Sequence, residues 1–150
     1  MLRRAKADDP SDVRILVVDD DADACELLAR LVESQGWQAD RLHSHQDAIL
    51  QLSRPDHRVD GLIADFSSGG TASNLKLLES VRHGDAHRRH LPVMLLTESP
   101  QNRSFAFQSG ADAFLVRPFH ANEMLEELHA MLSRTDEERE AHRREQLAAG

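Results

Sequence analysis

The chain has 150 residues, with 26 acidic and 18 basic side chains and a formal net charge of -8. This length predicts one domain whose core needs no metal or disulfide support, and the single cysteine, Cys25, excludes an internal disulfide framework. The acidic balance disfavours direct nucleic-acid binding, and no apolar run reaches the ~20 residues that span a bilayer, so we expect a cytoplasmic protein without membrane contact.

Strand-like and helix-like segments alternate along most of the chain. Apolar runs rich in β-branched residues predict strands at 13–18, 37–42, 59–64, 92–96 and 113–116. Apolar residues at three- and four-residue steps predict helices that begin at residue 22, span 47–52, begin with Asn74 as a cap, and span 102–108 and 121–132. Five strands alternating with five helices predict an α/β protein with a doubly wound parallel sheet.

The two ends of the chain lack this pattern. Residues 1–12 have no apolar periodicity and predict a disordered lead-in, which leaves residues 13–133 for the domain. Residues 134–150 hold four basic and five acidic side chains, with Leu147 as the one large apolar residue. This composition predicts a charged tail or linker, either a solvated helix or a frayed segment, without a coiled-coil seam.

Chemically active side chains follow the predicted strands. Asp19 and Asp20 come after the first strand and Asp65 after the third, whereas Thr97 and Arg117 follow the fourth and the fifth. Because the carboxyl ends of parallel strands meet at one edge of the sheet, we expect these groups to lie together. Crowded carboxylates repel one another unless a hard cation lies among them, and an all-oxygen site suits Mg²⁺. Such a site predicts phosphoryl transfer, with a carboxylate as the nucleophile.

Over residues 13–133 the chain resembles the receiver domain of two-component response regulators. The resemblance is carried by Ile-Leu-Val-Val-Asp-Asp at 15–20, Asp65, Leu-Leu-Thr at 95–97, and the segment 110–119 around the fifth strand. It implies a flavodoxin-like doubly wound fold of five parallel strands. It also implies a regulatory phosphoacceptor rather than an enzyme, with at most self-catalysed phosphoryl transfer and autodephosphorylation.

The resemblance assigns a role to each residue of the site. Asp65 would accept a phosphoryl group from a histidine kinase or a histidine phosphotransfer protein. Asp19, Asp20 and Asp65, with the backbone carbonyl of Ser67, would hold Mg²⁺.

The resemblance also implies a switch. Thr97 would hydrogen-bond the phosphoryl group, and the rotamer of Phe114 would follow Thr97, so that phosphorylation changes a protein-interaction surface. The downstream partner or output domain would lie outside this chain, and the sequence leaves open whether the chain forms a homodimer.

The chain departs from the family pattern beside the site. Arg117 stands where the family has a lysine, and of the 18 basic residues only Lys6 and Lys76 are lysines, neither in place to substitute. Guanidinium is planar and fork-shaped whereas lysine is a compact point charge, so the exchange is not conservative. Glu98 puts an acidic side chain beside the predicted pocket, and the segment from 97 to 110 is shorter than the family pattern.

These departures leave alternatives open. The first is a pseudo-receiver, a protein-interaction module that acts without phosphorylation and has Arg117 in place of the family lysine. A remote alternative is a phosphatase of the haloacid dehalogenase type, because Asp19-Asp20-Asp21 superficially matches the nucleophile motif of that family.

Overall fold

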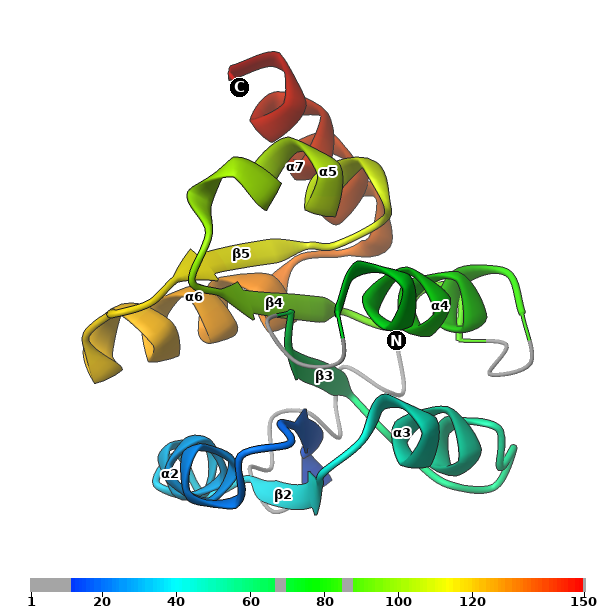
Figure 1. Ribbon diagram of the computed structural model, residues 1–150, viewed down its shortest axis with the longest axis vertical. Coiled ribbons are helices and arrows are strands. Elements are labelled where there is room, and N and C mark those ends of the chain that lie inside the picture. The colour runs from blue at the N-terminus through cyan, green and yellow to red at the C-terminus, as the bar shows by residue number, and fades with distance from the viewer. Residues whose placement is uncertain (1–11, 67–69, 85–87, 150) are drawn as a thin grey trace.

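Five strands form a single parallel sheet in the computed structural model, which describes residues 12–66, 70–84 and 88–149 (Figure 1). The strands are β1 (Arg14–Val18), β2 (Gln38–Leu42), β3 (Gly61–Asp65), β4 (Val93–Thr97) and β5 (Ala113–Val116). They lie in the order β2-β1-β3-β4-β5, and every neighbouring pair is parallel. This order reverses direction between β1 and β3, so the predicted doubly wound, flavodoxin-like sheet is confirmed.

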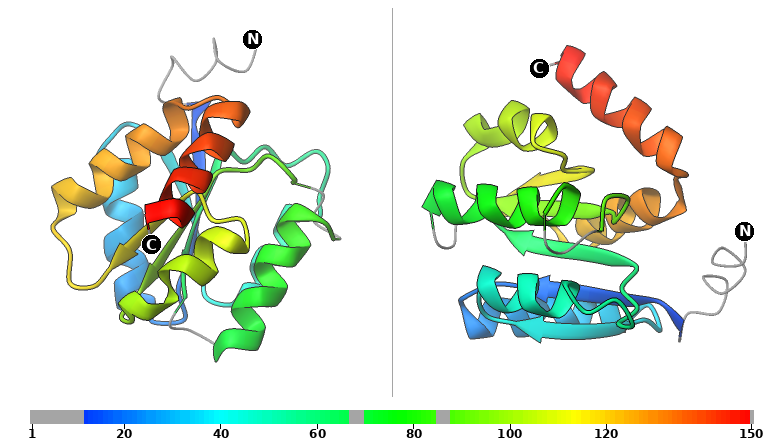
Figure 2. Two further views of the ribbon diagram at one scale, coloured as in Figure 1. Left: turned by 90° about the horizontal axis from the view of Figure 1, so that it is seen from above. Right: turned by 90° about the vertical axis from the view of Figure 1, so that its right-hand side faces the viewer.

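Helices cover both faces of the sheet (Figures 1 and 2). The helices are α2 (Ala22–Glu33), α3 (His45–Leu52), α4 (Gly70–Arg82), the 3₁₀ turn η2 (Pro100–Asn102), α5 (Arg103–Gln108), α6 (Ala121–Ser133) and α7 (Asp136–Ala149). Helices α3, α4 and α5 pack on one face, and α2 and α6 pack on the other. None of the helices in the described part of the chain has the length and apolar character needed to cross a membrane.

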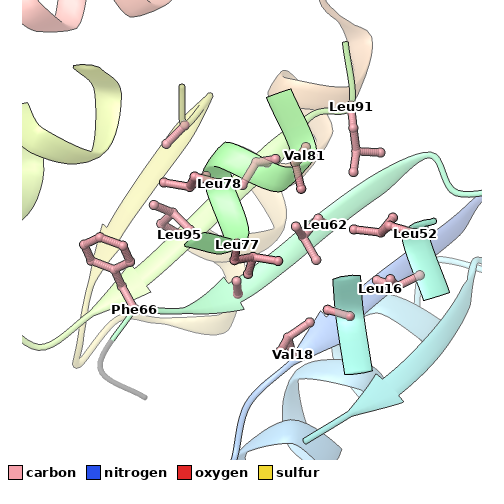
Figure 3. Close-up of a cluster of buried hydrophobic side chains, with 14 of the residues drawn as sticks. Leu16, Val18, Leu52, Leu62, Phe66, Leu77, Leu78, Val81, Leu91 and Leu95 are labelled. Atoms are coloured by element: carbon pink, nitrogen blue, oxygen red, sulfur yellow. The ribbon is translucent and has the colours of Figure 1, made fainter. Parts of the chain in front are cut away.

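One core cluster lies between the sheet and helices α3 to α5. Leu16, Leu62 and Leu95 project from three adjacent strands and are almost fully buried against Leu77 and Leu78 of α4 (Figure 3). The strands are buried on both faces, which explains why they read as continuous apolar runs rather than as alternating ones.

The second core cluster fills the opposite face of the sheet. Ile15 and Ile63 meet Leu28 of α2 and both Met124 and Leu128 of α6, and none of these side chains is more than 4% exposed. Apolar packing therefore holds α2 and α6 firmly on the sheet.

Two local predictions need correction. Asn74 does not cap a helix: α4 begins earlier, at Gly70, and the buried side chain of Asn74 donates a hydrogen bond to the carbonyl of Phe66 instead. The predicted helix at 102–108 starts as a 3₁₀ turn and becomes α-helical only at Arg103, because Pro100 begins the turn. The predicted lead-in lies outside the described residues, except for Asp12.

Helix α7 is a separate element and does not continue α6. The chain turns at Arg134, whose backbone is extended, and Thr135 then starts the new helix. The Thr135 hydroxyl accepts a hydrogen bond from the N–H of Glu138, and the Glu138 carboxylate accepts one from the N–H of Thr135. This reciprocal capping box accounts for the helix start in a segment with few apolar residues.

Candidate functional site

The ends of β1, β3, β4 and β5 bring the predicted site residues to one edge of the sheet. Strand pairing aligns Val18 of β1 with Ala64 of β3, which places Asp19 and Asp65 side by side beyond that register. Thr97 pairs with Val116 at the ends of β4 and β5, and Arg117 follows directly. Pairing of the parallel strands thus juxtaposes residues that lie almost 100 positions apart in the sequence.

Three carboxylates converge at this edge. Asp19, Asp20 and Asp65 each offer an oxygen, and the three oxygens all lie within 4.8 Å of one another. Asp19 and Asp65 are 1% and 6% exposed, whereas Asp20 is open to solvent. Three negative groups at this separation form an acidic cluster with the oxygen donors that a hard divalent cation prefers.

The local backbone holds Asp19 in place. One of its carboxylate oxygens accepts a hydrogen bond from the N–H of Asp21 at 3.0 Å. Asp21 in turn caps α2, because its side chain accepts hydrogen bonds from the N–H groups of Asp23 and Ala24. The run of three aspartates therefore combines two members of the acidic cluster with a helix cap that sequence reasoning did not assign.

Burial raises the pKa of Asp19 above its ordinary value. The negative charge of Asp65 acts in the same direction, whereas the hydrogen bond from Asp21 and the positive charge of Arg117 act against it. Burial thus disfavours the ionised form of Asp19, and a nearby cation stabilises that form.

Arg117 bridges two of the three carboxylates. Its Nη1 lies 3.1 Å from Oδ1 of Asp65, and its Nη2 lies 3.2 Å from Oδ2 of Asp19. The Arg117 backbone N–H donates to the carbonyl of Thr97 at 2.8 Å, which ties the start of the side chain to the end of β4. The two nitrogens of the fork serve two different residues, whereas a lysine would have to reach both from a single ammonium nitrogen.

The two predicted switch residues lie on neighbouring strands, Thr97 at the end of β4 and Phe114 in β5. Thr97 is 2% exposed, and its hydroxyl accepts a hydrogen bond from the N–H of Ser99 at 3.1 Å. Phe114 is half-buried, and its ring centroid lies 6.3 Å from that of Phe107 on α5. The neighbouring Glu98 is exposed.

The predicted site set is thus brought together, with one member left outside. Ser67, whose carbonyl was predicted as a metal ligand, lies outside the described residues. Lys76 is exposed on α4, away from the strand ends. Sequence reasoning placed Arg117 beside Asp65 but missed its contact with Asp19, and the chain offers no local signal for that pairing.

Comparison with known proteins agrees with this geometry. The family model of the response regulator receiver domain matches residues 15–129. The transcriptional regulatory protein TrcR of Mycobacterium tuberculosis is 30% identical over 138 residues, which are 89% of this chain and 51% of TrcR. The response regulator MprA of Mycobacterium bovis is 33% identical over 128 residues, 84% of this chain and 53% of MprA. The chain therefore spans about half the length of these relatives.

Solved structures share the fold. The non-phosphorylated HemR receiver domain of Leptospira biflexa matches with a TM-score of 0.69 and 28% identity, covering 82% of this chain and 96% of the other. The response regulator TrrA of Thermotoga maritima, in complex with Mg²⁺-BeF, matches with a TM-score of 0.68 and 26% identity, covering 79% of this chain and 98% of TrrA. With the strand order, the acidic edge and these matches in agreement, the chain belongs to the response regulator receiver domain family of two-component systems.

Proposed function

We propose that Asp65 accepts a phosphoryl group from the phosphohistidine of a histidine kinase or a histidine phosphotransfer protein. The observation that carries this proposal is the convergence of three carboxylates and one guanidinium at the strand ends. A carboxylate oxygen of Asp65 attacks phosphorus, the bond between phosphorus and the histidine nitrogen breaks, and an aspartyl phosphate results. The receiver itself is residues 13–133, with the lead-in and the tail outside it.

The donor set of the acidic cluster fits Mg²⁺. Asp19, Asp20 and Asp65, with the backbone carbonyl of Ser67, would hold the ion. When bound, it would supply positive charge to neutralise the phosphoryl oxygens. The residues of the chain do the remaining work, which is to orient the nucleophile and to bind the product.

Arg117 has two parts in this proposal. Before transfer, its ion pair with Oδ1 of Asp65 fixes the orientation of the carboxylate. After transfer, the same guanidinium donates to a phosphoryl oxygen, with the geometry that a planar fork offers to an oxyanion.

Thr97 and Phe114 then convert phosphorylation into a change at the surface. The hydroxyl of Thr97, which accepts a hydrogen bond from the N–H of Ser99, donates its own hydrogen to the phosphoryl group. The ring of Phe114 follows, and its contact with Phe107 carries the change to α5. A protein partner or an output domain outside residues 13–133 reads that surface in the cytoplasm, and a homodimer is one form that the reading can take.

A pseudo-receiver is the second candidate function, and a specific observation favours it. Arg117 already supplies a positive charge to Asp19 and Asp65, two of the three carboxylates of the acidic cluster. In this function the arginine is a permanent internal cation, and the chain binds partners without phosphorylation. Membership in the receiver family removes the basis for the haloacid dehalogenase alternative.

Intact mass spectrometry separates the two functions. The protein is incubated with Mg²⁺ and acetyl phosphate, and we expect a single phosphoryl adduct that is absent from Asp65→Asn. Asp23→Asn is the matched control, because Asp23 is an exposed carboxylate in the first turn of α2, outside the acidic cluster, and this variant should form the adduct normally. If the wild-type protein gives no adduct and binds no Mg²⁺, the phosphoacceptor function is wrong and the pseudo-receiver replaces it.

A further inference from the structure

Helix α7 folds back over α5 and the start of β5 (Figure 2). The surface that it covers, here called the docking face, consists of His90, Arg103, Phe107 and Asp112. The receiver family match ends at residue 129, so α7 is an addition to the matched region. Its contacts are polar almost throughout, which sets it apart from the other helices.

Asp112 is the centre of the docking face. It is fully buried, and its two carboxylate oxygens have different partners. Oδ2 accepts hydrogen bonds from the N–H of Val93 and from Arg82, each at 2.9 Å, so it joins β4, α4 and β5. Oδ1 pairs with Arg143 and lies 3.5 Å from Nε of Arg139, and both of these arginines belong to α7. One oxygen therefore holds the domain together and the other holds α7.

Other contacts extend along α7 on both sides of Asp112. Arg139 donates to the carbonyl of His90 at 2.5 Å, and the ring of His142 stands edge-on to that of Phe107, with centroids 6.2 Å apart. Arg103 of α5 donates to the carbonyl of Gln146 at 3.3 Å. A cation at the last turn of a helix satisfies a carbonyl that has no partner within the helix and complements the helix dipole.

The docked face of α7 is a polar stripe. Arg139, His142, Arg143 and Gln146 recur at three- and four-residue steps, as the members of one helix face do. Helix α6 instead turns fully buried methionine and leucine side chains to the sheet. Polar interfaces of this kind are weaker and more reversible than apolar ones.

An open groove of about 390 Å³ runs along α7, lined by Phe107 and Gly110 from the domain and by Glu137, Glu140 and Arg143 from α7. Helix α7 contributes no residue to either hydrophobic core cluster. It is therefore seated on the docking face without being built into the apolar core.

We propose that α7 is a detachable cover of the docking face, and that a partner helix carrying two arginines four residues apart takes its place. Such a helix would bind the three groups that α7 contacts now, which are the buried Oδ1 of Asp112, the carbonyl of His90 and the side chain of Arg103. Arginines four residues apart would reach Asp112 and His90 as Arg139 and Arg143 do. Detachment does not require phosphorylation, so this proposal goes beyond the proposed function and can be tested independently of it.

The experiment compares two neighbouring arginines of α7 by amide hydrogen exchange on the full chain. Arg143→Gln removes a charge-assisted bond to Asp112, whereas Arg144→Gln removes only an exposed side chain 3.5 Å from Glu140. An isolated polar helix of 14 residues is marginal in water, so detachment shows as exchange. We expect exchange in α7 and α5 to rise about 10- to 100-fold in Arg143→Gln, with α6 unchanged and Arg144→Gln like the wild type. Equal exchange in the two variants would overturn the proposal.

A peptide of residues 134–149 supplies the partner helix in a second measurement. A tethered α7 competes with the peptide at an effective concentration in the millimolar range, so the wild-type chain should bind it weakly. We expect the Arg143→Gln chain to bind the labelled peptide at least about tenfold more tightly than the wild-type chain does, as measured by fluorescence anisotropy. If the peptide does not distinguish the two chains, α7 is a fixed part of the fold and the proposal is wrong.

Discussion

Arg117→Gln tests the site most directly, because it removes the positive charge that lies 3.1 Å from Asp65 and 3.2 Å from Asp19. A hydrogen bond to a charged group contributes about 1.5–3 kcal/mol, and breaking a buried ion pair costs about 3–5 kcal/mol. The Arg117 side chain is 23% exposed, so we take the lower range. For a chain of this length, each kcal/mol of lost unfolding free energy lowers Tm by roughly 2–4 °C, so the Tm of the variant should fall by about 3–12 °C without metal.

Adding Mg²⁺ should raise the Tm of Arg117→Gln by more than it raises the Tm of the wild type. At the proposed Mg²⁺ site, the ion and Arg117 would share Asp19 and Asp65 as partners, so the variant should gain more stability from the same Mg²⁺ concentration, as ligand linkage requires. Circular dichroism melting, started in EDTA and continued as a Mg²⁺ titration, measures both effects. Arg144→Gln is the control, since its side chain is 68% exposed and lies far along α7. If Arg117→Gln melts with the wild type in EDTA and shows the same Mg²⁺ dependence, the bridge does not hold the carboxylates and the reasoning fails.

Three further predictions concern other parts of the molecule. Leu128→Ala leaves a cavity beneath α6 and should cost about 2–5 kcal/mol in urea unfolding, whereas a smaller loss would show that the site collapses. Hydrogen bonds from Arg41, and then from Arg30, lower the pKa of Glu26 to about 2. The stability that this group contributes is therefore present above pH 4.5 and is lost as the pH falls towards 2. An NMR titration should show the low pKa of Glu26 in the wild type and a value nearer 4.5 in Arg41→Gln. Burial, and then the charge of Arg134, lower the pKa of His142 below 6.5, so α7 should loosen as the pH falls below that value. Amide hydrogen exchange in α7, corrected for its intrinsic pH dependence, should show this loosening in the wild type and not in His142→Gln.

The fold was predictable because the strands are buried on both faces. The strand at 113–116 is predicted to the residue, the first two strands start one residue later than predicted, and β3 and β4 are displaced by a residue or two at both ends. Val13 and Val59 show the reason for these displacements. Both are buried apolar residues that lie just before Arg14 and Gly61, the first register-paired residues of β1 and β3, so burial alone does not mark where a strand begins.

The acidic cluster was predictable for a different reason. Once the strands are parallel, their carboxyl ends share an edge, and Asp19, Asp20 and Asp65 must gather there. The bridge made by Arg117 does not follow from this rule. Strand β5 lies two places from β3 and three from β1, roughly 10 and 15 Å away in a sheet with about 4.8 Å between strands. Which carboxylate the side chain reaches depends on its length and path across that edge, which no sequence pattern encodes.

The docking of α7 was not predictable from hydrophobic periodicity. The tail has one large apolar residue, Leu147, which remains 37% exposed. Because the tail has no apolar stripe, hydrophobic periodicity predicts a solvated segment there. The actual contacts depend on a carboxylate at residue 112 and arginines at 139 and 143, and only the fold reveals that these positions meet.

Arginine connects the site and the tail in physical terms. In the described part of the chain, three clusters join several charged groups through arginine: Asp19 and Asp65 with Arg117, Asp112 with Arg82, Arg139 and Arg143, and Glu26 and Glu33 with Arg41. In two of these places a single guanidinium serves two carboxylates, which a lysine ammonium does poorly because its charge is compact and its donors are not held in one plane. Arg117 is thus one case of a device that recurs through this lysine-poor chain. At position 117 the two arms of the fork contact Asp65 and the more deeply buried Asp19 at once, whereas a lysine would have to reach both carboxylates from one ammonium nitrogen.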